Sequence, residues 1–132
     1  MTVVLDTSAV AAVIFGEPDA EGLLAAMTRS AGDLLLSAAT AVELGIVVEA
    51  RQGPAATDDL RRMLTTLTVV TVPLDEEQAG IALAAWRRFG KGLHVAGLNL
   101  GDCYSYALAK SRQAPLLFKG EDFAQTDIAS AL

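Results

Sequence analysis

Cysteine and histidine are nearly absent from this chain of 132 residues, which contains one of each, Cys103 and His94. A single cysteine forms no disulfide within the chain. The N-terminus has no basic region, and Asp6 interrupts its short apolar stretch, so we expect no secretory signal and a reducing, cytoplasmic location. One histidine excludes a histidine-rich zinc site. No histidine is placed to activate Cys103, which we expect in the core.

Long apolar runs and a basic excess are also missing. The longest uncharged stretch, residues 63–74, contains Pro73 and four threonines and is shorter than the roughly 18 residues that a membrane span requires. The formal net charge of −6 argues against a DNA-binding protein with a broad basic surface. Nucleic acid remains open as a substrate, because divalent cations held by carboxylates present positive charge to a phosphate.

Aromatic residues make up only 5% of the chain, whereas 52% of it is hydrophobic. This composition supports a substantial core and argues against disorder. The length fits one domain, and no stretch has the character of a linker. We therefore expect residues 1–132 to form a single domain.

Continuous apolar runs alternate with helical segments along the chain. Without period-2 alternation, such runs predict strands that are buried on both faces. The expected strands are residues 2–5, 33–37, 68–72 and 115–118. The expected helices are residues 8–15, 18–29, 38–51, 57–67, 75–89 and 100–112, with a short helix or a last strand in residues 124–132. The order predicts an α/β/α sandwich around a mainly parallel sheet of four to five strands, where ligands bind beyond the carboxyl ends of the strands.

Acidic residues fall at that edge of the expected sheet. Asp6 and Asp122 follow the first and the fourth expected strand, and Glu43 and Asp102 lie on helices that can pack over the same edge. The neighbours of Glu43 at three and four residues are mostly apolar, which predicts that its carboxylate points inward. Converging carboxylates repel one another, and hard cations such as Mg²⁺ or Mn²⁺ relieve that repulsion through oxygen ligands.

Each of these acids also has a purely structural interpretation. Asp6 is suited to capping a helix, and Asn99 is suited to capping the helix that carries Asp102. Glu43 has the alternative of an ion pair with a distant arginine, and Asp122 that of an ordinary turn residue. The residues alone leave both interpretations open.

Four segments resemble the PIN-domain ribonucleases, and within them the VapC toxins of VapBC type II toxin–antitoxin systems. They read VVLDTSAV (3–10), SAATAVELGIVVEAR (37–51), GKGLHVAGLNLGDCYSYALAK (90–110) and PLLFKGEDFAQTDIA (115–129). The resemblance spans nearly the whole chain. It implies a PIN-like fold and divalent-metal-dependent hydrolysis of RNA phosphodiester bonds.

The resemblance further implies roles for individual residues. The implied catalytic quartet is Asp6, Glu43, Asp102 and Asp122. Within it, Asp6 and Asp102 are implied as the principal ligands of Mg²⁺ or Mn²⁺. Thr7 or Ser8 would orient Asp6 or a bound water. Asp127 would contact the metal ligands without binding the metal itself. The candidates for binding flanking phosphates, against the alternative of ordinary solvated charges, are Arg87, Arg88, Lys91 and Lys119.

The partners implied by the resemblance are an RNA substrate, a second copy of the chain in a homodimer, and a VapB-type antitoxin whose C-terminal tail reaches the acidic pocket. No membrane partner is expected. Two other classes of protein compete with this interpretation. One comprises receiver domains and haloacid-dehalogenase-type phosphatases, which also place an Asp after a parallel strand. The other is a non-catalytic binding module in which the acids are structural.

Overall fold

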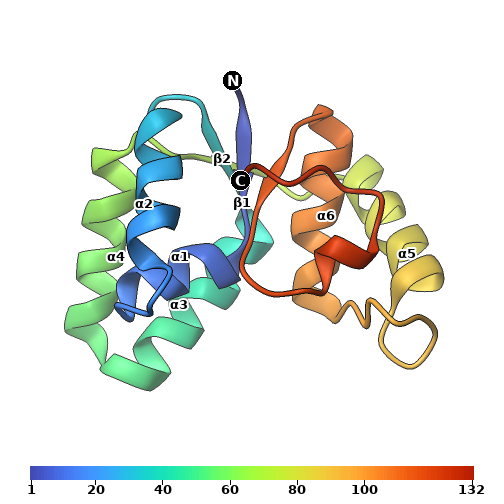
Figure 1. The fold of residues 1–132 in the computed structure, drawn as a ribbon, viewed down its shortest axis with the longest axis horizontal. Helices are drawn as coiled ribbons and strands as arrows, with labels where there is room; N and C mark the ends of the chain where they lie inside the picture. Colours follow the sequence, from blue (N-terminus) through green and yellow to red (C-terminus); the bar gives the residue numbers. More distant parts are fainter.

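A computed structural model describes all residues 1–132 and shows one sheet of four strands (Figure 1). The strands are β1 (Val3–Leu5), β2 (Leu34–Ser37), β3 (Val70–Val72) and β4 (Leu116–Leu117). Their order is β3-β2-β1-β4, and all three pairings are parallel. This confirms the predicted parallel sandwich, with four strands. Of the short helix or last strand expected in residues 124–132, the structure has a 3-10 helix at Phe123–Gln125 and a single bridge between Leu116 and Ser130.

Six α-helices cover the two faces of the sheet. They are α1 (Thr7–Ile14), α2 (Ala20–Arg29), α3 (Ala38–Gln52), α4 (Pro54–Thr66), α5 (Glu76–Phe89) and α6 (Leu100–Arg112), followed by a short 3-10 helix, η1 (Phe123–Gln125). Figure 1 shows α1 to α4 on one side of β1 and β2, and α5 and α6 on the other. None of the helices combines the length and apolar character that crossing a membrane would require.

Two helix starts differ from the sequence prediction. We expected a helix from Pro18, but α2 begins at Ala20 behind the cap residue Asp19. We expected Gly53-Pro54 to separate two helices as far as residue 57, but α4 begins directly at Pro54. Gly53, at φ +87°, ends α3 and precedes α4 by itself, and proline is favourable in the first helical position because it needs no N–H partner there.

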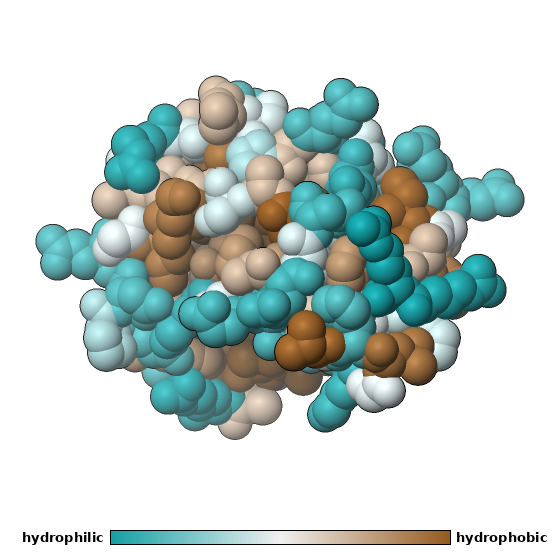
Figure 2. Space-filling view, turned by 45° about the vertical axis from the view of Figure 1, so that its right-hand side comes forward, coloured by the Kyte–Doolittle hydropathy of each residue, from teal (hydrophilic) through white to brown (hydrophobic).

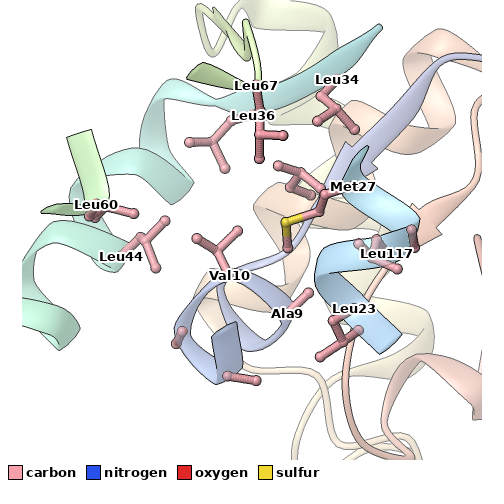
Figure 3. Packing of buried hydrophobic residues seen from close by; sticks show 14 of the residues in the cluster. Ala9, Val10, Leu23, Met27, Leu34, Leu36, Leu44, Leu60, Leu67 and Leu117 are labelled. Carbon is pink, nitrogen blue, oxygen red and sulfur yellow. The ribbon is translucent and has the colours of Figure 1, made fainter. Parts of the chain in front are cut away.

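The core is divided by the sheet into two clusters. Along β1, Val3 and Leu5 pack with α1 to α4, whereas Val4 packs with α5 and α6. Figure 3 shows the first cluster, to which Val10 of α1, Met27 of α2 and Leu44 of α3 contribute. The alternation follows from the strand period of two, and each face is apolar because both are covered by helices.

Strand register brings distant parts of the chain to one edge. Val4 and Leu5 pair with Leu116 and Leu117, and the N–H of Asp6 donates to the carbonyl of Leu117 at 3.0 Å. The carboxyl ends of β1 and β4 therefore lie side by side. The loops that leave these two strands start from the same place on the sheet.

Leu23 and Leu24 offer a matched test of the core beneath this edge. Leu23 is 1% exposed and Leu24, its neighbour on α2, is 40% exposed. Truncating a fully buried leucine to alanine costs about 2–5 kcal/mol of unfolding free energy. We expect Leu23→Ala to fall in that range and Leu24→Ala to cost much less, as measured by urea unfolding. Equal losses would contradict the packing described.

Candidate active site

Asp6 stands at the carboxyl end of β1 and is almost fully buried, at 2% exposure. It is the N-cap of α1, and its Oδ2 accepts from the backbone N–H of Ser8 at 3.0 Å and from the Ser8 hydroxyl at 2.6 Å. The N–H of Lys119, in the loop after β4, donates to Ser8 Oγ at 3.0 Å. The capping interpretation is therefore correct, and the same contacts fix the carboxylate next to the β4 loop.

Ser105 of α6 supplies the partner of the other Asp6 oxygen. Its hydroxyl donates to Asp6 Oδ1 at 2.6 Å, and its own side chain is fully buried. Sequence reasoning missed this residue. The available signal was its position one helical turn after Asp102, as a polar residue among apolar neighbours on α6.

Glu43 of α3 lies half-buried between two other elements. The hydroxyl of Thr7, the first residue of α1, donates to Glu43 Oε1. On its other side, a Cβ added to Gly101 would lie 1.9 Å from Glu43 Oε2, so only glycine leaves room for this carboxylate. The apolar neighbours that we expected to draw it inward face solvent instead, since Ile46 is 64% and Val47 37% exposed.

Asp102 occupies the first turn of α6 as part of a capping box. Asn99 Oδ1 accepts from the N–H of Asp102 at 2.9 Å, and Asp102 Oδ2 accepts from the N–H of Asn99 at 3.0 Å. Burial raises the pKa of Asp102 to about 6, against the lowering effect of the Asn99 hydrogen bond. The negative charges of Asp6, Asp122 and Glu43 raise this pKa further. The other three acids named from the sequence thus lie close enough to Asp102 for their charges to act on it.

Asp122 completes this group from the loop that follows β4. It is exposed and precedes η1, without a side-chain hydrogen bond to that helix. Lys119, earlier in the same loop, pairs with Glu17 and, at 3.3 Å, with Asp19. These pairs attach the loop to the segment between α1 and α2.

Other polar residues named from the sequence lie elsewhere. Asp127 accepts from Tyr106 at 2.6 Å and pairs with Lys110 at 2.9 Å and Arg88 at 3.3 Å, so it fastens the C-terminal segment to α5 and α6 instead of supporting the acids. Arg88 and Lys119 are therefore engaged in ion pairs. Lys91 has no ion pair and lines a hollow of about 450 Å³ between α5 and α6.

His94 and Cys103 have structural surroundings. His94 Nδ1 accepts from the N–H of Ala96 at 3.0 Å, and its ring packs edge-on against Phe89. Cys103 is 2% exposed, as expected for a core residue. Burial, together with the charge of Asp102, raises the pKa of its thiol to about 11, which disfavours the nucleophilic thiolate.

The donor chemistry of the acidic group suits a hard divalent cation. It consists of carboxylate oxygens. Burial and the neighbouring negative charges raise the pKa of Asp102, and a bound cation would relieve that repulsion. The gap left by Gly101 keeps the Glu43 carboxylate beside α6. In the present arrangement, no three or more His, Cys, Asp and Glu side chains are drawn together so that they could hold an ion. Closing such a site would require these side chains to move closer together.

Comparisons with known proteins agree with this architecture. The sequence matches the PIN domain family over residues 3–129. It is 47% identical over 127 residues to "Ribonuclease VapC" of Mycolicibacterium smegmatis, covering 96% of this chain and 98% of that protein. It is 48% identical to "Ribonuclease VapC30" of Mycobacterium tuberculosis, covering 96% of each chain.

Two solved structures have a similar fold. Mycobacterium tuberculosis VapC20, described as a sarcin-ricin loop cleaving toxin, superposes with a TM-score of 0.80 over 97% of both chains at 14% identity. FitAcB from Neisseria gonorrhoeae gives a TM-score of 0.68 at 23% identity and covers 98% of this chain and 96% of that one. The fold and the family match define a PIN-domain protein. Within that family, the chain belongs to the VapC ribonucleases.

Gly101→Ala tests the contact between α6 and Glu43. The added methyl group would displace the flexible end of Glu43 rather than the backbone, and alanine is the better helix former by about 1 kcal/mol. We expect a folded protein with undiminished stability that loses at least roughly ten-fold in Mn²⁺ affinity, as an outer-shell disturbance typically does. Gly80→Ala in α5, where the new Cβ meets nothing within 4 Å, is the control and should leave Mn²⁺ binding unchanged.

The pH dependence of stability tests the raised pKa of Asp102. Its folded-state pKa of about 6 lies above the ordinary 3.8, so the folded protein binds more protons than the unfolded chain between these values. This contribution to stability is therefore lost as pH rises from 3.8 to 6. In EDTA, the free energy of unfolding of Asp102→Asn relative to that of the wild type should rise between pH 3.8 and 6 and then stay constant, as measured by urea unfolding. A difference in unfolding free energy that does not change with pH would contradict the raised pKa of Asp102.

Asp102→Ala separates charge from capping in the same measurement. An asparagine oxygen can still accept from the N–H of Asn99, whereas alanine removes half of the capping box. We expect the alanine variant to be less stable than the asparagine variant at every pH.

Proposed function

We propose that this VapC ribonuclease is the toxin of a type II toxin–antitoxin system and hydrolyses RNA phosphodiester bonds with Mg²⁺ or Mn²⁺. The observation that carries the site assignment is the effect of Asp6, Glu43 and Asp122 on the pKa of Asp102. Asp6, Glu43 and Asp122 lie near Asp102 although their negative charges disfavour its ionised form. A cation-binding site accounts for that arrangement, whereas helix capping alone accounts for only Asp6 and Asp102.

Each acid has a distinct place in the proposed reaction. Asp6 and Asp102 would hold the cation, with Asp6 fixed by Ser8. Glu43, held by Thr7, and Asp122 would complete the cage or orient the attacking water. When bound, the divalent cation would polarise a phosphoryl oxygen and stabilise the charge that develops on the leaving 3′-oxygen.

Basic residues near the site would contact the flanking RNA phosphates. Arg87 and Lys91 form no ion pair within the chain, so they remain candidates for this role. Arg88 and Lys119 would first have to leave Asp127 and Glu17. Lys91 is the better placed of the two free cations, because it shares its hollow with Asn99, the capping partner of Asp102.

The proposed partners follow from charge and from exposed apolar surface. A VapB-type antitoxin would inhibit by inserting a basic side chain among the carboxylates, where it would compete with the cation. Apolar side chains reach the surface among hydrophilic ones (Figure 2), and on α5 they include Leu83 and Trp86 at 49% and 44% exposure. This surface supports the proposed homodimer. We further propose that the chain is a single PIN domain that acts in the cytoplasm.

The decisive experiment is an RNA cleavage assay with Mn²⁺ or Mg²⁺ on total RNA from the source cell. We expect discrete fragments from the wild type and none after EDTA treatment. Asp6→Asn should lower the cleavage rate by at least roughly a hundred-fold, since it neutralises a proposed cation ligand while its oxygen can still cap α1.

Glu121→Gln is the matched control, because Glu121 is an exposed acid in the same loop as Asp122. It should cleave like the wild type. Equal activity of the wild type and Asp6→Asn would reject the acidic site and favour a binding module in which the acids are structural.

A further inference from the structure

Asp6 receives a serine hydroxyl on each of its two carboxylate oxygens. Ser8 Oγ donates to Oδ2 from α1, and Ser105 Oγ donates to Oδ1 from α6, both at 2.6 Å. Ser105 is fully buried and comes from a position 99 residues along the chain from Asp6. Two short hydrogen bonds from different elements thus prevent the Asp6 carboxylate from rotating.

A third hydroxyl stands behind Ser105. Thr40 Oγ1 lies 3.3 Å from Ser105 Oγ, and the Thr40 side chain is fully buried. A carboxylate only accepts, so the single proton of Ser105 goes to Asp6, and Thr40 is then the donor to Ser105. The result is a directed chain from Thr40 through Ser105 to Asp6. Its outer contact is longer, and therefore weaker, than its inner one.

This hydrogen-bond chain joins three of the four segments that carry acids of the proposed site; the loop with Asp122 lies outside it. Thr40 and Glu43 are three residues apart on α3, and Ser105 and Asp102 are three residues apart on α6, so each pair occupies neighbouring turns. Asp6 ends β1. A shift of α3 or α6 against the sheet would stretch this hydroxyl chain and move Glu43 or Asp102 at the same time.

Ser105 donates to Asp6 Oδ1, an oxygen that Ser8 does not contact. The two donors of Ser8 already serve Asp6 Oδ2. The Ser105 hydroxyl occupies one of the two acceptor sites of Oδ1 and so determines the direction of the remaining one. Such control over a single oxygen is what binding an ion between several carboxylates requires.

We propose that Ser105 is a positioning residue that aims Asp6 Oδ1 at the bound cation, and that Thr40 orients Ser105. The inference rests on the proposed function, since it concerns the cation of that site. Neither residue touches the RNA. Both act through Asp6, and they hold β1, α3 and α6 in the register that the acids require.

Calorimetric titration of the metal-free protein with Mn²⁺, without RNA, tests this directly. We expect Ser105→Ala to bind Mn²⁺ roughly 10- to 100-fold more weakly than the wild type, the usual effect of removing a hydrogen-bond partner of a metal ligand. Thr40→Val, which keeps the shape but removes the hydroxyl, should show a smaller loss in the same direction. Thr40→Ser should recover most of it.

Two further readouts separate positioning from general structural damage. Ser111→Ala is the matched control, because Ser111 lies on the same helix and donates only to the carbonyl of Leu108. It should bind Mn²⁺ like the wild type. Cleavage by Ser105→Ala should recover as Mn²⁺ is raised to saturation, whereas a misfolded variant would not recover. Urea unfolding in EDTA verifies that each variant is folded.

Each outcome supports or overturns the proposed role of Ser105. A folded Ser105→Ala that binds Mn²⁺ within two-fold of the wild type would overturn the inference. If Ser105→Ala does not fold, Thr40→Val decides it by the same criterion. Binding lost in Asp6→Asn but intact in Ser105→Ala rejects this inference alone. Binding that survives Asp6→Asn, or is absent from the wild type, rejects the proposed site and the inference together.

Discussion

The buried carboxylate of Asp6 is the constraint around which the rest of the site is arranged. A charge at 2% exposure is costly unless hydrogen bonds compensate for it, and Asp6 obtains these from two helices at once. Ser8 comes with the helix that Asp6 itself caps, whereas Ser105 comes with α6, which packs on the opposite face of the sheet. Stabilising this one side chain therefore fixes where both helices meet the end of β1.

Helix capping by Asp6 and Asp102 is compatible with their proposed role in binding a cation. Asp6 caps α1, and Asp102 closes the capping box of α6, so both carboxylates lie at helix N-termini, where the helix dipole favours negative charge. The dipoles and the backbone N–H groups lower the cost of holding acids close together. The raised pKa of Asp102 shows that they do not remove it. Because burial and the remaining repulsion disfavour the ionised Asp102, the metal-free protein has a lower free energy of unfolding at neutral pH than it would have with this residue protonated.

Small residues leave room for the carboxylates at this edge of the sheet. Gly101 lets α6 approach the Glu43 carboxylate of α3 at a distance that any side chain would prevent. The hydroxyls of Thr7, Thr40 and Ser105 supply donors without filling the space that the carboxylates need. The loop after β4 is held by Lys119, through its backbone to Ser8 and through its side chain to Glu17. Lys119, one of the four candidates for binding phosphate, thus positions the loop in this structure.

The sequence by itself determined the α/β order and the parallel sheet, because buried strands appear as continuous apolar runs, and it named the four acids of the proposed site, because polar residues follow the strand ends. Local pattern also sufficed for the caps of Asp6 and Asn99, which depend on neighbours within three residues. It failed for Asp127, which binds Arg88 and Lys110, and it did not reveal that Glu43 contacts Thr7 and Gly101. Only the tertiary structure decided these contacts and the role of Ser105, because they join residues far apart in the chain whose meeting depends on how helices pack on the sheet.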